Sequence, residues 1–251
     1  MERLDGKIAL ITGASRGIGR AMALKFASLG ASIALNYVRD DTAAQETLKQ
    51  ILQLGAEGAL FKANVGDEKE LSEMAQAVLA RFGTLDILVH NAALGAFKPV
   101  HELRSNQWAL SLDINARALL ILAQKFLPAM EKKRAGNILA ISSLGAHRYI
   151  PNYGAIGVSK AALETLVRYL AAEFAPKGIR VNCVSGGLVN TDALKAFGGS
   201  QNLKDEIVKR TPAGRIGEPE DLADVAAFLV SNEARWIYGQ TVIADGGLSL
   251  L

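Results

Sequence analysis

The sequence predicts an α/β fold in which a seven-stranded parallel sheet is covered by helices on both faces. Short apolar runs without polar alternation recur along the chain, and each is followed by a longer segment with helical periodicity. Strands of this kind are buried on both faces, as in a parallel sheet joined by crossover helices. The 251 residues contain no linker, repeat or low-complexity tract. We therefore expect one doubly wound domain over residues 1–251.

The elements follow from these patterns in order. The expected strands are Lys7–Ile11, Ser32–Asn36, Gly58–Lys62, Asp86–His90, Asn137–Ile141, Arg180–Val184 and Thr241–Ala244. The expected helices include Gly17–Leu29, Thr42–Leu54, Glu68–Phe82, Leu112–Lys132 and Ser159–Pro176. We predict the spatial order 3-2-1-4-5-6-7, in which ligands bind beyond the carboxyl ends of the strands. The longest interruption of the strand–helix alternation is the glycine-containing segment 188–219, and we expect it to be a substrate lid.

Composition excludes several classes of function. The net charge of +3 does not suggest a nucleic-acid-binding protein. No apolar run reaches the ~18–20 residues that span a membrane, and the first residues lack the apolar core of a secretion signal. We therefore expect a soluble cytoplasmic protein. The single cysteine, Cys183, lies in an apolar run and is expected to be a buried thiol. His90, His101 and His147 show no metal-ligand spacing, so no metal site is expected.

A glycine-rich motif, Thr12-Gly-Ala-Ser-Arg-Gly-Ile-Gly19, directly follows the first expected strand and opens the first helix. Gly13 permits a tight turn, and Gly17 and Gly19 let the backbone approach a pyrophosphate. The helix N-terminus supplies free N–H groups and positive potential for the same anion. This context is the one that a dinucleotide-binding motif requires, so the fold is expected to be of the Rossmann type. The expected contacts in the loop are Gly13, Ser15, Arg16, Gly17, Ile18 and Gly19.

The spacing Thr-Gly-x-x-x-Gly-x-Gly resembles that of the short-chain dehydrogenases/reductases, and the resemblance covers about residues 6–247. His90-Asn-Ala-Ala93 resembles the family's Asn-Asn-Ala-Gly, and Asp245-Gly-Gly247 its closing Asp-Gly-Gly. Asn115 resembles the active-site asparagine of the family, and Ser143 its catalytic serine. The usual Pro-Gly of the family reads Gly-Gly at 186–187. The resemblance implies a homotetramer and further cofactor contacts from Asn64, Val65, Asn91, Ala92, Gly187, Val189 and Thr191.

The end of the second strand favours NADPH/NADP+ over NAD. An NAD site usually has an acid there, bonded to the ribose 2′-hydroxyl. This chain has Asn36-Tyr-Val-Arg39 and no acid before Asp40. Arg39 and Arg16 are expected to hold a 2′-phosphate through charge-assisted hydrogen bonds. The alternative is that both arginines are merely solvated.

Tyr153 and Lys160 are seven residues apart, and Ile156 stands where most of the family carries its tyrosine. Isoleucine cannot donate a proton. Seven residues are about two helical turns, so Tyr153 and Lys160 would share a face, with the tyrosine ~4–5 Å further along the axis. When an enoyl thioester accepts hydride at its β-carbon, charge develops on the carbonyl oxygen two carbons away. A donor set back by one turn fits that geometry.

The Tyr-x6-Lys pattern resembles the enoyl-[acyl-carrier-protein] reductases. Together with the ordinary glycine loop and Ser143, it resembles their type III group. The resemblance implies NADPH-dependent reduction of trans-2-enoyl-acyl-carrier-protein, the last step of fatty-acid elongation. It assigns Tyr153 to the thioester oxygen and Lys160 to the nicotinamide ribose, where the cation would also lower the tyrosine pKa. Asn115 would support a water path to Lys160, and the expected catalytic set is Tyr153, Lys160, Ser143 and Asn115.

The expected partner is an acyl-carrier protein, which is acidic and would dock on basic residues near the mouth of the site. In the family's 3-oxoacyl-carrier-protein reductases, residues matching Arg134 and Lys177 contact the carrier. Arg134 belongs to the densest basic run of the chain, Lys132-Lys-Arg134. The alternative is an ordinary solvated cluster.

Several alternatives remain open. The chain could be a 3-oxoacyl-acyl-carrier-protein reductase or another NADP(H)-dependent carbonyl reductase, such as a sugar dehydrogenase. It could also be an NADP(H)-binding sensor without turnover. At the level of residues, Tyr153 could be a packing aromatic, Tyr149 could be the acid, and Ser143 could cap a turn.

Overall fold

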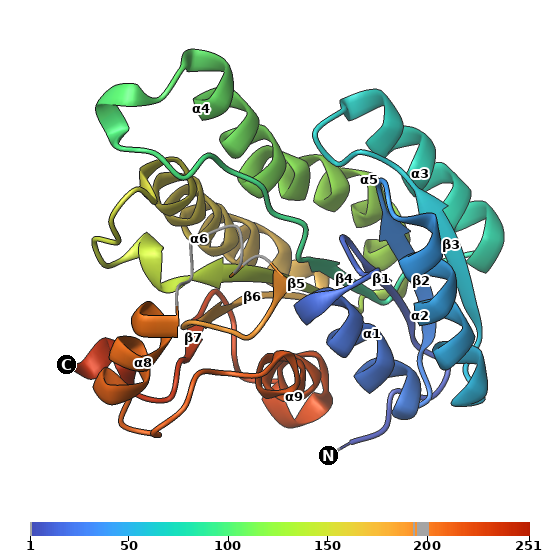
Figure 1. The fold of residues 1–251 in the computed structure, drawn as a ribbon. Coiled ribbons are helices and arrows are strands. Elements are labelled where there is room, and N and C mark those ends of the chain that lie inside the picture. The colour runs from blue at the N-terminus through green and yellow to red at the C-terminus, as the bar shows by residue number, and fades with distance from the viewer. Residues whose placement is uncertain (1, 193, 195–200) are drawn as a thin grey trace.

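A computed structural model describes residues 2–192, 194 and 201–251 of the chain. The strands form one seven-stranded sheet in the order β3-β2-β1-β4-β5-β6-β7, and all neighbouring pairs are parallel (Figure 1). The predicted fold class and strand order are confirmed. The strands are β1 Ile8–Ile11, β2 Ser32–Tyr37, β3 Gly58–Lys62, β4 Ile87–His90, β5 Gly136–Ser143, β6 Ile179–Gly186 and β7 Thr241–Ala244.

Helices cover both faces of the sheet. Figure 1 shows α3, α5 and α6 on one face and α1, α2 and α9 on the other. The helices of the described residues are α1 Gly17–Ser28, α2 Asp41–Gln53, α3 Glu68–Phe82, α4 Ser105–Leu112, α5 Ala118–Lys133, α6 Gly154–Phe174, α8 Gln201–Arg210 and α9 Pro219–Val230.

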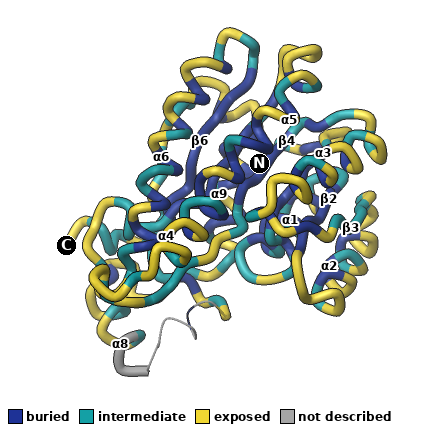
Figure 2. Tube along the Cα trace, turned by 90° about the horizontal axis from the view of Figure 1, so that it is seen from above, coloured by how far each residue is buried: buried dark blue, intermediate teal, exposed yellow. Residues whose placement is uncertain are grey.

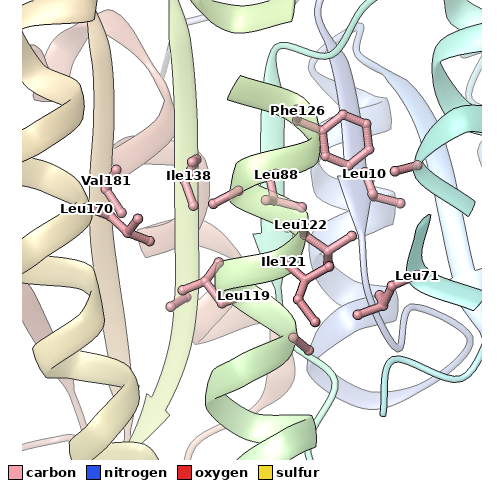
Figure 3. Close-up of a cluster of buried hydrophobic side chains, with 14 of the residues drawn as sticks. Leu10, Leu71, Leu88, Leu119, Ile121, Leu122, Phe126, Ile138, Leu170 and Val181 are labelled. Carbon is pink, nitrogen blue, oxygen red and sulfur yellow. The ribbon is translucent and has the colours of Figure 1, made fainter. Parts of the chain in front are cut away.

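Two apolar clusters, one on each side of the sheet, form the core. On the α5 side, Leu122 and Phe126 pack against Leu10 and Leu88 of the strands (Figure 3). Figure 2 shows the central strands as the buried centre of the molecule, whereas the edge strands β3 and β7 are only partly buried. Because both faces of the strands are buried, their sequences read as continuous apolar runs.

Two predicted helices differ from the observed ones. The segment expected as one helix over Leu112–Lys132 is interrupted by a π-helical turn, Asp113–Arg117, between α4 and α5. Such widened turns occur frequently at functional sites, and this one carries Asn115. The long helix expected from Ser159 already begins at Gly154, so Tyr153 stands immediately before it.

The predicted lid over 188–219 is described only in part. Its residues Gly198 and Gly199 lie outside the described residues, whereas helix α8 and residues 211–219 lie within them. Val189 forms a parallel bridge with Gly217, which ties the start of this segment to its end. Its role as a lid stays a prediction. None of the described helices combines the length and apolar character needed to cross a membrane.

Candidate active site

The carboxyl ends of four adjacent strands gather the motifs that the sequence singled out. The glycine loop follows β1, Asn91 follows β4, Ser143 ends β5 and Gly187 follows β6, and these strands are neighbours in the order β1-β4-β5-β6. Parallel strands share one carboxyl edge, so motifs far apart in sequence meet there. The edge is therefore the candidate site.

The glycine loop has the backbone that close approach of a ligand requires. Gly13 and Gly17 adopt φ of 64° and 55°, a region that side chains with a Cβ avoid. A Cβ on Gly19 would collide with the carbonyl oxygen of Gly13. The Nδ2 group of Asn91 donates to the carbonyl oxygens of Thr12 at 2.9 Å and Gly13 at 3.2 Å. Asn91 thus holds the loop in shape from the neighbouring strand.

The N-terminus of α1 is open toward this loop. Its N-cap residue, Arg16, makes no side-chain capping bond. By contrast, α2 and α3 are capped by Asp40 and Asp67. Uncapped N–H groups at a helix N-terminus are donors for a phosphate. The loop and this helix end therefore fit the pyrophosphate of a dinucleotide.

The two acids that follow β2 are both engaged within the protein. Asp40 accepts a hydrogen bond from the backbone N–H of Ala43 at 2.9 Å. Asp41 accepts from Lys62 at 2.8 Å and from the hydroxyl of Tyr37 at 2.7 Å. The Lys62 and Tyr37 bonds hold the pKa of the Asp41 carboxyl below its usual value. Because these carboxylates are occupied, neither resembles the free acid of an NAD site, whereas Arg39 is exposed.

The remaining predicted cofactor contacts lie along the same edge. A Cβ built on Gly17 would lie 3.4 Å from the methyl group of Thr191, so the glycine loop and the segment after β6 approach each other. Val65 is buried in the core, which leaves only its backbone for a contact with adenine. Asn64 follows β3, and Ala92, like Asn91, follows β4.

Tyr153 and Ser143 form a hydroxyl pair at the centre of the edge. The Oη of Tyr153 donates to the Oγ of Ser143 at 3.1 Å. The tyrosine ring packs against Phe97 with a centroid separation of 5.9 Å. Burial raises the pKa of the Tyr153 phenol, and the Ser143 bond opposes that shift only in part. The net shift is upward because burial dominates, so the lowered tyrosine pKa expected beside Lys160 is not found. The phenol is thereby kept protonated, as a hydrogen-bond donor must be.

Neither of the two other positions considered for the acid fits the role. Ile156 occupies the position of the usual family tyrosine, but it is 7% exposed, and a Cβ on Gly95 would collide with it. Tyr149 is 89% exposed on the loop before α6. Tyr153 is the N-cap residue of α6, and its carbonyl oxygen accepts a hydrogen bond from the N–H of Gly157 at 2.7 Å. It therefore stands at the junction of the loop and the helix, and not inside the helix.

Lys160 is buried beneath this pair. Its Nζ donates to the carbonyl oxygen of Ile141 at 2.6 Å, and the residue is 3% exposed. Burial lowers the pKa of Lys160 to about 8, while Cys183 and Glu164 act against that shift. The contact of Lys160 with a ribose stays a prediction. Cys183 is buried as expected, and burial raises its pKa to about 12.

Asn115 acts as a clamp between elements. Its Nδ2 group donates to the carbonyl oxygen of Leu94 at 2.9 Å and to the Oγ of Ser159 at 2.8 Å, and its Oδ1 accepts from the N–H of Leu94 at 2.9 Å. Its own carbonyl oxygen lies 3.3 Å from the Nε2 of His90. Both polar ends of Asn115 are therefore engaged by protein groups, and a role in a water path stays a prediction.

His90 should make the protein less stable in acid. Burial lowers its folded-state pKa to about 3 from an ordinary 6.5, with the Lys160 charge adding to the shift. Above pH 6.5 the imidazole is neutral in both states, and as pH falls below that value only the unfolded chain takes up the proton. The free energy of unfolding should then drop by about 1.4 kcal/mol per pH unit.

Urea denaturation at pH 7, 6 and 5 measures how the free energy of unfolding changes with pH. In His90→Asn this free energy should fall less steeply, by about 1.4 kcal/mol per pH unit. In His101→Asn, whose ring is exposed, the pH dependence should match wild type. Parallel curves for wild type and His90→Asn would contradict the assignment.

The predicted basic docking run lies away from this edge. Lys132-Lys-Arg134 precedes the first residue of β5, whereas Ser143 is the last, and the eight residues of that strand span ~25 Å. Lys177 follows the far end of α6 from Tyr153 and pairs with Glu131 at 3.3 Å. Residues 132–134 lead into the amino end of β5, and Lys177 leads into the amino end of β6. In this chain the basic run is therefore at the opposite edge of the sheet from the site, and the expectation that it lies near the mouth is wrong.

Sequence reasoning missed some residues that shape the site. The Oδ1 of Asn36 accepts from the N–H of Gly13 at 3.2 Å, and its Nδ2 donates to the carbonyl oxygens of Phe61 and Ala63. This buried amide joins the ends of three strands beneath the glycine loop. A polar residue inside an apolar run was the available signal. Glu164 is a second such residue.

Comparison with known proteins identifies the family. A family model described as "Enoyl-(Acyl carrier protein) reductase" matches residues 13–249. The 1-cyclohexenylcarbonyl-CoA reductase of Streptomyces collinus is 39% identical over 98% of this chain and 88% of that protein. The 3-oxoacyl-[acyl-carrier-protein] reductase FabG of Staphylococcus epidermidis is 35% identical over 96% of this chain and 98% of that protein.

Solved structures agree with these relatives. A 7α-hydroxysteroid dehydrogenase complexed with NADH and 7-oxo glycochenodeoxycholic acid superposes with a TM-score of 0.94 at 37% identity, covering 98% of this chain and 95% of that one. A gluconate 5-dehydrogenase from Beutenbergia cavernae with bound NADP has the same TM-score at 33% identity, covering 99% of each chain. With this fold, this site and relatives across nearly its whole length, the chain belongs to the short-chain dehydrogenases/reductases and is an oxidoreductase.

Proposed function

We propose that the protein reduces trans-2-enoyl thioesters with NADPH, and that its substrate is carried by an acyl-carrier protein. The observation that carries this proposal is the position of the Tyr153 phenol at the candidate site. Tyr153 pairs with Ser143 at 3.1 Å, whereas the usual family position holds the buried Ile156. The printed description of the matching family model supports the same reading. So does the S. collinus relative, whose named substrate is a thioester with a ring double bond next to its carbonyl.

The residues around Tyr153 suit an apolar acyl group. The ring of Phe97 stacks beside the phenol, and Val100 lies against Gly154 at the start of α6. Val100 and Leu94 are 65% and 50% exposed, so this wall presents apolar surface toward solvent. An acyl chain would cover such a surface, whereas a polyol would gain little from it.

The protein groups divide the work as follows. With substrate bound, the O–H of Tyr153 turns from Ser143 to the thioester oxygen, where negative charge develops, and Ser143 then orients the phenol by donating its own O–H to the phenol oxygen. A preorganised donor of this kind contributes ~10²–10³ in rate. Lys160 places a buried positive charge behind the pair. The dinucleotide, when bound, supplies the hydride that adds to the β-carbon. The glycine loop, Arg16 and Arg39 would hold it, with Lys160 and Thr191 toward its nicotinamide end.

The alternative is reduction of 3-oxoacyl thioesters. Its specific support comes from the FabG relatives, 34–35% identical across nearly the whole chain. Several of the similar relatives are 3-oxoacyl reductases, so the comparisons support this alternative better than the enoyl substrate. The displaced tyrosine favours the enoyl substrate. A serine and tyrosine that share a hydrogen bond would also polarise a ketone, so the pair itself does not separate the two substrates.

A direct assay separates these functions. Purified protein should oxidise NADPH much faster with a crotonyl thioester than with the acetoacetyl thioester, because the proposal assigns Tyr153 to a carbonyl oxygen two carbons away from the carbon that accepts hydride. Equal rates, or a faster reaction with acetoacetyl, would establish the carbonyl-reductase alternative. NADPH binding without turnover of either thioester would indicate a sensor.

The carrier is tested with the same reaction. KM for the carrier-linked thioester should be lower than KM for the matching coenzyme A thioester, and the difference should shrink as salt is raised, because an acidic carrier docks largely through charge. Equal KM values for the two substrates at low and high salt would contradict a carrier-linked substrate.

Arg39 should set the preference for NADPH. In Arg39→Ala, loss of a charge-assisted bond to the 2′-phosphate should raise KM for NADPH by about tenfold or more and leave KM for NADH nearly unchanged. Lys49→Ala, an exposed residue of α2, is the matched control for loss of a surface charge. An unaltered NADPH/NADH ratio in Arg39→Ala would remove the assignment.

A further inference from the structure

A buried carboxylate lies beside the candidate site and takes no part in the reaction as proposed. Glu164 of α6 is 2% exposed and stands one helical turn after Lys160. Its Oε1 accepts a hydrogen bond from the Oγ of Ser142 at 2.5 Å. Its Oε2 lies 2.5 Å from the Nε2 of His147. A carboxylate only accepts, so His147 donates its Nε2–H.

The two partners of Glu164 flank the segment that carries Ser143. Ser142 precedes Ser143 at the end of β5, and His147 follows the short 3₁₀ turn Leu144–Ala146. One side chain of α6 therefore ties both ends of this segment to the helix that also bears Lys160. A buried carboxylate is costly unless its oxygens are paired, and here each oxygen has its partner.

The tied segment also forms the seat of the Tyr153 ring. A Cβ built on Gly145 would lie 2.5 Å from Cδ1 of Tyr153, so the ring lies directly on this backbone. The N–H of Gly145 lies 3.4 Å from the Oγ of Ser143. Movement of the segment would therefore displace the Ser143 hydroxyl and the phenol together.

Charge gives Glu164 a second effect on the site. Lys160 faces His90 of β4, Cys183 of β6 and Glu164 on its own helix, while Glu164 also faces His147 and Cys183. Burial keeps His90 neutral and Cys183 a thiol near pH 7, since their pKa values are about 3 and about 12. Among the described groups that face Lys160, Glu164 is thus the one carboxylate.

We propose that Glu164, held by Ser142 and His147, is a positioning residue that fixes the Ser143–Tyr153 pair against α6 and keeps the buried Lys160 cationic. The proposal rests on the proposed function only in placing the reaction at this pair, and it holds for either thioester. Glu164 touches neither substrate nor cofactor in this role. It acts through Ser142, His147 and Lys160.

Three variants separate shape from charge. Glu164→Gln keeps the size and hydrogen-bonding capacity of the side chain and removes its charge. Ser142→Ala removes one tether and keeps the charge. Glu173→Gln removes an exposed carboxylate from the same helix and is the control. Each is assayed with whichever thioester the wild type reduces.

Glu164→Gln should lower kcat by about tenfold with less than a threefold change in the KM of the thioester, and should move the alkaline limb of the kcat profile about one pH unit lower. Ser142→Ala should lower kcat without moving that limb. Glu173→Gln should match wild type, and the thermal midpoints should stay close enough for all variants to be folded at the assay temperature. Wild-type kcat and pH profile in Glu164→Gln would overturn the proposal.

A binding measurement decides the matter without turnover. The Kd of NADPH, followed by its fluorescence between pH 6 and pH 10, should begin to rise about one pH unit lower in Glu164→Gln than in wild type, because Lys160 loses its proton earlier. Coincident binding curves would refute the charge effect. Failure of wild type to reduce either thioester would refute the proposed function instead, and would leave this comparison valid.

Discussion

Tyr153→Phe should lower kcat by about two to three orders of magnitude and leave NADPH binding and thermal stability close to wild type. The substitution removes one hydroxyl, the donor that the proposed mechanism places on the thioester oxygen, and such donors contribute ~10²–10³ in rate. The ring remains and keeps its packing against Phe97. Steady-state kinetics and a fluorescence titration with NADPH measure the two effects separately.

Tyr149→Phe is the matched control for this result. Tyr149 is 89% exposed on the same loop, so loss of its hydroxyl should change neither kcat nor Kd. Full activity in Tyr153→Phe together with a loss in Tyr149→Phe would reverse the assignment. A fall in NADPH affinity equal to the fall in kcat would instead make Tyr153 a binding residue.

Arg180→Met should destabilise the fold more than any surface change. The guanidinium of Arg180 is buried in β6 and donates to four carbonyl oxygens at the end of α9 and the turn after it. These are Leu229 at 3.0 Å, Val230 at 3.3 Å, Ser231 at 2.8 Å and Ala234 at 2.8 Å. A helix leaves its last carbonyls without partners, and here one side chain supplies the donors.

Methionine has similar length but no donor, so the carbonyl oxygens of Leu229 and Val230 would lose the guanidinium, while those of Ser231 and Ala234 would keep only the backbone N–H groups of Ala234 and Ile237. We expect a loss of ~3–5 kcal/mol in the free energy of unfolding and a drop of roughly 10 °C in Tm. Arg168→Met removes an exposed arginine from α6 and should change Tm by little. Equal midpoints for Arg180→Met and wild type would show that water replaces the guanidinium.

The fold was predictable because its signals are local. A strand buried on both faces must be apolar throughout, so β1 to β7 could be located from composition alone, and the crossover helices fixed their order. The site could be placed because Gly13, Ser143 and Tyr153 follow strand ends that share one edge. Each of these inferences uses only residues close together in sequence.

The π-helical turn and the buried polar contacts could not be predicted in this way. Asn115 widens its turn through bonds to Leu94 and Ser159, which lie 21 and 44 residues away. Arg180 meets its acceptors 49 to 54 residues downstream. In the sequence such residues are only polar interruptions of apolar runs, and their partners become visible in the folded chain.

The place of Tyr153 ahead of α6, and not within it, also bears on how such a site changes over evolution. A tyrosine inside a helix can move only by whole helical turns, and each move alters the packed face. Tyr153 stands at the junction of the helix and a loop in which residues 148, 149, 151 and 152 are exposed, so substitutions in that loop can redirect its ring while β5 and α6 keep their packing. Reaction specificity can therefore diverge in this scaffold at little expense to stability, and laboratory evolution of new substrates would start from this loop.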